Sequence, residues 1–317
     1  MRRGMVYLAI LVAISLAFGV RVLAAEQFSI ATGGTAGTYY PIGSAIASVV
    51  SKYVPGVKMN AEATGASVAN LRMLKAKKVD FIMAASNTAY GAYSGEPPFD
   101  KDPVKNLRGI AALYPEVFQF VVRKDSGIKS FYDLRGKKVA VGAPGSGTER
   151  TAKLVLAAHG LTYGDIKPQF LSFAEAMTAL KDRVVDCAIV GAGVPTPAVI
   201  DAAMLIDINL LSVDEKVIGD FLKKHPYLAL FEIAPGTYKG VDQSVITVSS
   251  PALLCVDEGL SEEVVYKIVK AIFDHIDEIA ASHAQAKNIK LETALKGMSI
   301  PLHPGAERFF REKGLIR

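Results

Sequence analysis

The chain has 317 residues, 50% of them hydrophobic, and a formal net charge of +5 from 36 Lys and Arg against 31 Asp and Glu. Three arginines and no acid lie in residues 1–25, so the remaining chain has a net charge of only +2. With no basic run that alternates with aromatic residues, this small surplus gives no argument for binding nucleic acid. The remaining length exceeds one typical domain and favours two lobes.

The N-terminus has the layout of a secretory signal. A basic start precedes an uncharged stretch of apolar or small residues from Met5 to Val20, and "VRVLAA" then offers a cleavage site near Ala24 or Ala25. This stretch is short for a bilayer-spanning helix, although an uncleaved anchor is the alternative. We therefore expect residues 1–25 to be a signal peptide and the rest of the chain to be exported to the periplasm.

The first part of the exported chain alternates strand and helix patterns. A strand in "QFSIATGG" leads into the glycine-rich loop "ATGGTAGTYYPIG", and apolar residues at helical spacing then continue to Tyr53, before Pro55-Gly56. "VKMNAEA" has the pattern of a strand, "SVANLRMLKAKKV" of a helix and "VDFIMAAS" of a strand. The order is strand, glycine loop, helix, strand, helix, strand.

The same order returns about a hundred residues later. "KKVAVG" predicts a strand, "APGSGTE" a second glycine loop, and "RTAKLVLAAHG" a helix that ends at Gly160. "IKPQFLSF", "AEAMTALKDRV" and "VDCAIVGAG" then predict strand, helix and strand. Two units of one plan predict two similar α/β lobes with both glycine loops at the carboxyl ends of their strands, where open α/β sheets bind ligands.

Two strand-rich stretches connect the lobes. "LRGIAALYPEVFQFVVRKDSG" lies between the units, and "DQSVITVSSPALLCV" precedes the C-terminal helices. These two crossings predict a hinge with a ligand in the cleft between the lobes. The expected organisation is lobe 1 from residues 26–121, lobe 2 from 122–252, and a return to lobe 1 from 253–317.

The glycine loops predict an anion site at helix N-termini, which leave N–H groups unpaired and carry partial positive charge. In the first loop Pro41 suits the first helical position, so Tyr40 is expected to be the cap. The N–H groups of Ile42, Gly43 and Ser44 would then be available to a ligand. The hydroxyls nearby belong to Thr35, Thr38, Tyr39 and Tyr40.

In the second loop Ser146 and Glu149 fit a capping box, so Ser146 serves either the helix or a ligand. Thr148 and the loop amides are candidates in both cases. The two cysteines, Cys187 and Cys255, lie in apolar strand-like runs, and the sequence leaves open whether they pair.

Known catalytic and cofactor motifs do not fit. The first loop is neither a dinucleotide fingerprint nor a P-loop, and the five histidines lack metal-ligand spacing. "GASVA" resembles a nucleophile elbow around Ser67, but Ala69 replaces the final glycine. We therefore expect a binding protein without cofactor or metal, and keep a secreted serine hydrolase that uses Ser67 as a less favoured alternative.

The whole exported chain resembles the TAXI family of solute receptors of tripartite ATP-independent periplasmic (TRAP) transporters. The resemblance rests on "ATGGTAGTYYPIG", "ATGASVANLRML", "GAPGSGTE", "GAGVPTPAV" and "IPLHPGAERFFREKG". It implies a type II periplasmic-binding-protein fold, a small carboxylate ligand such as glutamate or a dicarboxylate, and delivery to an ion-coupled membrane permease. A binding protein of an ABC importer or of a sensor system is the alternative.

The resemblance also implies the ligand contacts. In chain order they are Gly34, Thr35, Thr38, Tyr39 or Tyr40, Ser67, Asn70, Ser146, Gly147 and Thr148. Many members of the family have Gln-Ser-Asp where this chain has "ASN", ending at Asn87. Loss of that carboxylate predicts a ligand without an α-ammonium group, such as an oxo-acid or dicarboxylate, unless Asn87 keeps the hydrogen bonds of the Asp.

Overall fold

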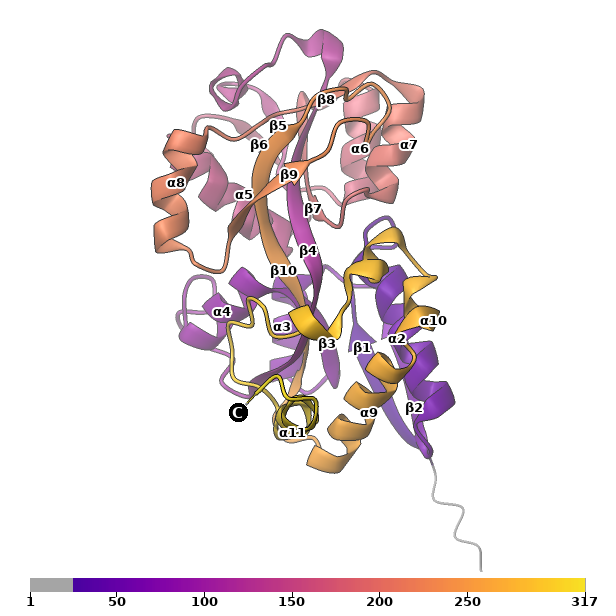
Figure 1. Ribbon diagram of the computed structural model, residues 1–317. Helices are drawn as coiled ribbons and strands as arrows, with labels where there is room; N and C mark the ends of the chain where they lie inside the picture. Colours follow the sequence, from indigo (N-terminus) through magenta and orange to yellow (C-terminus); the bar gives the residue numbers. More distant parts are fainter. Residues whose placement is uncertain (1–24, 317) are drawn as a thin grey trace, which may run out of the picture.

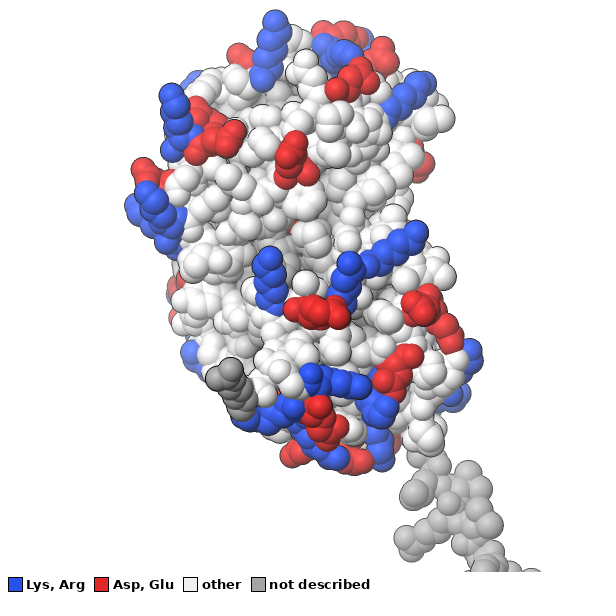
Figure 2. All heavy atoms as spheres, in the orientation of Figure 1, with Lys and Arg blue, Asp and Glu red and all other residues white. Residues whose placement is uncertain are grey.

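The structure is a computed structural model that describes residues 25–316 (Figure 1). The predicted signal peptide, apart from Ala25, lies outside the described residues. Within residues 25–316, no helix has the length and apolar character needed to cross a membrane. Figure 2 shows Lys and Arg interspersed with Asp and Glu on the face in view, so charges of one sign do not gather there.

Two α/β units of the same topology form the two lobes (Figure 1). The first unit comprises β1 (Glu26–Ala31), α2 (Tyr39–Tyr53), β2 (Val57–Glu62), α3 (Ser67–Lys75) and β3 (Phe81–Ala85). The second comprises β5 (Lys138–Ala140), α5 (Gly147–Ala158), β6 (Lys167–Gln169), α6 (Phe173–Lys181) and β7 (Cys187–Ala192). In each unit the first strand lies between the other two and is parallel to both, in the orders β2-β1-β3 and β6-β5-β7. The repeated plan read from the sequence is therefore confirmed.

Two long strands, β4 (Leu107–Arg123) and β10 (Val245–Asp257), run through both lobes (Figure 1). β10 is antiparallel to β3 and to β4, and β4 is antiparallel to β7, so a single sheet continues from one lobe into the other. The predicted fold class, two α/β lobes joined by a pair of strands, is confirmed. The predicted lobe boundaries, after residues 121 and 252, fall inside these two strands and stay a prediction.

The remaining elements cover the lobes. They are α4 (Ser86–Ser94), α7 (Pro197–Leu205), β8 (Ile208–Leu210), α8 (Glu215–Lys224), β9 (Ala229–Ile233), α9 (Glu262–Asp274), α10 (Ile276–Ala280) and α11 (Pro304–Glu312). The C-terminal helices lie on lobe 1, where α9 packs against α2 and α11 (Figure 1). Phe309 and Phe310 on α11 are buried in the core of lobe 1, so these two residues of the C-terminal motif "IPLHPGAERFFREKG" anchor the helix there. Cys187 and Cys255 are buried in the two different lobes and do not pair.

Direct hydrogen bonds join the lobes on both sides of the cleft. Arg150 of lobe 2 pairs with Glu96 of lobe 1 at 2.6 Å, and its side chain is only 10% exposed. On the other side, the amide of Gly193 in lobe 2 donates to Thr38 Oγ1 in lobe 1 at 3.1 Å. The structure is therefore a closed conformation, in which a solute between the lobes contacts both.

Gly193 of lobe 2 lies so close to lobe 1 that a larger residue at this position should prevent the two lobes from closing. A Cβ at this position would overlap Gln285 of lobe 1 and would lie 3.1 Å from Thr38 Cγ2. Gly193→Ala should therefore favour an open conformation, because overpacking costs about 1–3 kcal/mol. We expect small-angle X-ray scattering to give a larger radius of gyration for this variant than for the wild type. Gly219→Ala on α8, where a Cβ meets no atom within 4 Å, is the matched control. Superimposable curves for Gly193→Ala and the wild type would contradict the prediction.

Candidate functional site

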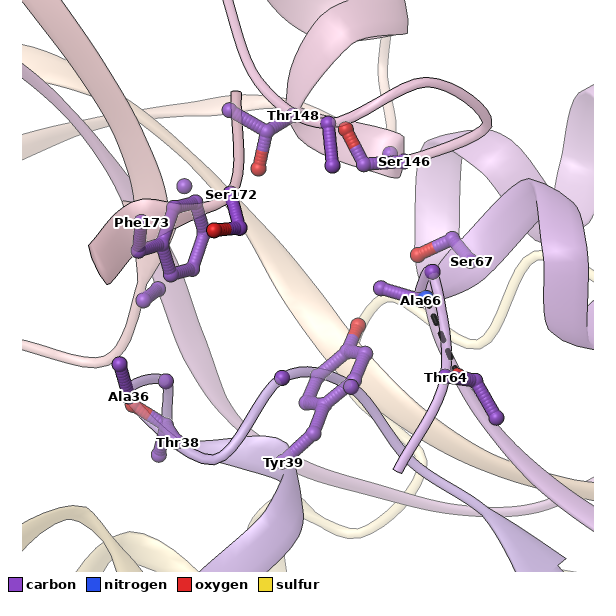
Figure 3. Close-up of a pocket in the computed structure, with 18 of the residues that line it drawn as sticks. Ala36, Thr38, Tyr39, Thr64, Ala66, Ser67, Ser146, Thr148, Ser172 and Phe173 are labelled. Carbon is purple, nitrogen blue, oxygen red and sulfur yellow. Dashed lines mark hydrogen bonds between the residues drawn. The ribbon is translucent and has the colours of Figure 1, made fainter. Parts of the chain in front are cut away.

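A cavity of about 200 Å³ lies between the lobes. Drug-sized ligands occupy about 300–1,000 Å³, so this cavity suits a smaller solute. Both glycine-rich loops line it, from Gly33 to Tyr39 and from Ser146 to Thr148. The other lining residues are Thr64, Gly65, Ala66, Ser67, Glu116, Phe118, Ala143, Ser172, Phe173, Ala174, Gly191 and Ala192. In Figure 3 the hydroxyls of Tyr39, Ser67 and Thr148 point into the cavity from different sides.

Four helices begin at the wall of the cavity. Their first residues, Tyr39 of α2, Ser67 of α3, Gly147 of α5 and Phe173 of α6, all line it. The amides of a first helical turn have no partner within their own helix, and the helix dipole adds partial positive charge of about half an elementary charge there. Because each of these helices has at least nine residues, their four N-termini together favour an anion in the cavity.

The four N-termini differ in how they are capped. In lobe 2, Ser146 Oγ accepts from the amide of Glu149 at 3.1 Å, and Ser172 Oγ accepts from that of Glu175 at 3.4 Å. In lobe 1, neither α2 nor α3 has a side-chain cap. Thr38 precedes α2, but its hydroxyl accepts the inter-lobe bond from Gly193. At α3 the amide of Ala69 already donates to Gly145 O of lobe 2 at 3.1 Å. The first-turn amides left without a partner among the described residues are those of Tyr39 and Tyr40 on α2 and of Ser67 and Val68 on α3, and these are the better positions for an anion.

Ser146 caps the N-terminus of α5, which is one of the two roles that the sequence left open for it, and it also lines the cavity. In the predicted capping box the side chain of Glu149 would accept from the amide of Ser146. In the structure Glu149 Oε1 instead accepts from the hydroxyl of Tyr163 at 2.8 Å. The hydroxyl of Thr148 forms no hydrogen bond within the described residues and is available to a ligand.

The predicted start of the first helix was wrong by two residues. α2 begins at Tyr39 with Thr38 as its cap, so Pro41 is its third residue and Ile42 already donates to Thr38 O at 3.5 Å. Proline loses no helix bond there because the first four amides lack intrahelical partners, and burial of Tyr39 favours the earlier start. The predicted donors of Gly43 and Ser44 therefore lie in the hydrogen-bonded second turn, and the first-turn amides of Tyr39 and Tyr40 take their place.

Most of the predicted ligand contacts line the cavity: Gly34, Thr35, Thr38, Tyr39, Ser67, Ser146, Gly147 and Thr148. Three do not. Tyr40 lies on α2 outside the lining. Asn70 is fully buried and donates to the carbonyls of Thr32 and Met83, so it fastens α3 to the sheet.

Asn87 is also fully buried outside the cavity. Its amide donates to Thr151 Oγ1 of lobe 2 at 2.7 Å, so its role here is to bridge the lobes. The exchange of Asp for Asn at this position therefore says nothing about the charge of a ligand in the cavity.

The sequence interpretation missed Glu116 and Phe118 on β4 and Phe173 at the start of α6. Glu116 is the one acid in the apolar run "ALYPEVFQFVV", an isolated charge that is a signal in itself. It was overlooked because the run was interpreted only as a connection between lobes. Phe173 follows a capping serine and carried no separate signal.

Glu116 is 6% exposed at the floor of the cleft, where β4 passes from one lobe to the other. Burial raises the pKa of its carboxyl to about 8, an effect that the nearby Tyr39 hydroxyl partly offsets. Nevertheless, Glu116 Oε2 and the hydroxyls of Tyr39 and Tyr114 are buried without a hydrogen-bond partner in the described part of the chain. Glu116 and Tyr39 line the cavity and Tyr114 does not, so the unpaired atoms of Glu116 and Tyr39 are the ones that a ligand with matching polar groups can reach.

The hydrolase alternative finds no support in this geometry. Ser67 Oγ accepts a hydrogen bond from the amide of Ala85 at 3.1 Å, and none of the residues that line the cavity is a histidine, lysine or arginine. A serine nucleophile needs an adjacent base, and Glu116 is not hydrogen-bonded to Ser67 in residues 25–316.

Two α/β lobes, two connecting strands and a cavity between the lobes are the features of the periplasmic-binding-protein fold. The chain belongs to the NMT1-like family, whose model matches residues 30–314.

Solved structures share this fold. A putative L-cystine ABC transporter from Listeria monocytogenes has a TM-score of 0.52 at 15% identity, covering 84% of this chain and 96% of that one. A protein from Bordetella bronchiseptica RB50 has a TM-score of 0.50 at 18% identity, with 94% and 91% covered. The ligand-binding component of an ABC-type import system from Staphylococcus aureus, with zinc bound, has a TM-score of 0.50 at 13% identity, with 84% and 80% covered. At these identities the similarity concerns the fold.

The buried carboxyl of Glu116 predicts a pH-dependent stability. Because its pKa in the folded protein is raised, its contribution to stability is full below its unfolded value of about 4.5 and is lost as the pH rises through about 8. Glu116→Gln should therefore be more stable, relative to the wild type, at about pH 9 than at about pH 5. Thermal unfolding of the ligand-free proteins, followed by circular dichroism, measures this difference in Tm. A difference that stays constant with pH would contradict the raised pKa.

Proposed function

We propose that the protein is an extracytoplasmic receptor that captures a small carboxylate in the cleft and delivers it to a membrane importer. The observation that carries the proposal is the convergence of four helix N-termini, two of them without a side-chain cap, on one cavity between the lobes. Lobe closure around the solute supports release to an importer, because only the closed form offers both sets of donors and a solute thus favours it.

Neutral donors suffice for such a solute. Hydrogen bonds to a charged group contribute about 1.5–3 kcal/mol each. Four or five bonds from helix amides and from hydroxyls such as those of Ser67 and Thr148 would offset the cost of immobilising the solute. They would still allow micromolar affinity, which corresponds to about 8 kcal/mol. No lysine or arginine is required, and none lines the cavity.

The importer that receives the solute is of one of two classes. The sequence motifs resemble receptors of TRAP transporters, which are ion-coupled. The structures of similar fold from Listeria monocytogenes and Staphylococcus aureus carry the names of ABC-type import systems. These neighbours favour the ABC importer, the alternative considered from the sequence, and we propose that class.

Calorimetry tests the capture of a carboxylate. The probes are glutamate, aspartate, alanine, 2-oxoglutarate, succinate and propionate, and we expect at least one to bind. Thr148→Val, which removes an unpaired hydroxyl in the cavity, should weaken that binding about tenfold or more, since about 1.4 kcal/mol is a factor of ten. Thr293→Val, on the exposed surface, should change nothing. Binding that is equally strong in both variants would place the solute elsewhere, and no binding by any acid would contradict the proposal.

Uptake measurements distinguish the two importer classes. In cells that contain the native importer, ionophores that collapse the ion gradients should leave uptake of the labelled solute intact while ATP is maintained. Depletion of ATP with the gradients maintained should stop it. The opposite pattern would assign the receptor to an ion-coupled permease.

A further inference from the structure

We propose that the solute is a zwitterionic α-amino acid with a short uncharged side chain, whose carboxylate lies at the N-termini of α2 and α3 and whose ammonium group binds Glu116. This inference rests on the proposed function, and it adds the second half of the ligand. It is argued from polar groups at the floor of the cleft for which a bound carboxylate alone provides no partner.

The first observation is the group of unpaired polar atoms at that floor. Tyr114, Glu116 and Phe118 alternate along β4, so their side chains lie on one face of the strand. Tyr39 comes to the same place from α2. Glu116 Oε2 and the hydroxyls of Tyr39 and Tyr114 have no partner among residues 25–316. Burial keeps the carboxyl of Glu116 largely protonated near neutral pH, and an adjacent ammonium group favours its ionised form. The ionised carboxylate accepts hydrogen bonds only and an ammonium group donates three, so the two groups pair at this floor.

The second observation is the charge balance of the cavity. Among residues 25–316, Glu116 is the only Asp or Glu that lines it, and no lysine, arginine or histidine does. A dicarboxylate would therefore bring two negative charges into a cavity where only helix ends oppose them, and it would leave Glu116 in its protonated form. A zwitterion divides its charges between the helix N-termini and Glu116 and leaves no charge unpaired.

The third observation is the size and polarity of the walls. The cavity has about 200 Å³, and apolar side chains, among them Phe118, Phe173, Ala143 and Ala174, line much of it. A long or charged side chain has no partner there, whereas a short apolar one packs against the rings. Glutamate is therefore expected to bind more weakly than alanine or valine.

Glu116 supplies from β4 the carboxylate that this chain lacks at position 87, where similar sequences carry Asp. The absence of Asp at position 87 favoured a ligand without an ammonium group, but Asn87 bridges the lobes outside the cavity. The acid available to an ammonium group lies instead on β4. The position of Asn87 thus removes the argument for a ligand without an ammonium group, which stays an untested prediction.

Matched pairs of ligands test the inference on the wild-type protein. Calorimetry compares alanine with propionate and valine with isovalerate, which differ only in the amino group. We expect the amino acids to bind at least tenfold more tightly. Repeating each titration in phosphate and in Tris reports proton exchange. At pH 7 an amino acid should bind with release of a proton, because Glu116, which is largely protonated in the ligand-free protein, ionises beside the ammonium group, whereas the matched acid without an amino group should release none. Tyr39 and Tyr114, which face Glu116, have pKa values raised well above neutrality and do not contribute.

Glu116→Gln supplies the second arm. The variant should weaken binding of alanine and valine at least tenfold and should leave propionate and isovalerate unchanged or tighter. Glu292→Gln, an exposed change of the same charge, is the control and should behave as the wild type. If the acids without an amino group bind as tightly as the amino acids, or if Glu116→Gln weakens neither, the inference is overturned while the proposed function stands. If none of the acids binds the wild type, the proposed function itself fails.

Discussion

The structure depends on one constraint: a helix N-terminus needs partners for its first amides. Two of the four helices that begin at the cavity take them from their own serines, Ser146 and Ser172. The other two, α2 and α3, have no side-chain cap. The amide of Ala69 on α3 donates to Gly145 O of lobe 2, and the other first-turn amides of these two helices require water or a ligand. The cavity lies between the two lobes, so a small anion bound there can replace water as the partner of these amides.

The hinge strand contributes the opposite charge. β4 joins the lobes and at the same time brings Glu116 to the floor of the cleft. Burial of a carboxyl in the middle of a hinge costs stability, which a structural role alone does not explain. A bound solute that pairs with Glu116 would offset this loss of stability. The two ends of the cavity, positive helix termini and a negative carboxyl, then suit the two ends of one small zwitterion.

Much of the fold could be predicted from the sequence because the same local pattern occurs twice. Strand, glycine loop and helix follow each other in both halves, and short-range periodicity is enough to identify them. The site was only partly predictable. Thr38 and Thr148 lie in the loops that carry the pattern, whereas Glu116 reaches the cavity through the pairing of β4 with strands from both lobes. Asn70 and Asn87 were misplaced because burial and hydrogen bonding, not chain position, decide which side an amide faces.

The central claim concerns where the acid group of the solute lies. A crystal structure with the tightest-binding amino acid or carboxylate tests it most directly. The account predicts carboxylate oxygens at hydrogen-bond distance, about 2.7–3.2 Å, from first-turn amides of α2 or α3, with the lobes closed as here. A carboxylate held by the lobe 2 helices alone, or at the outer surface, would contradict it.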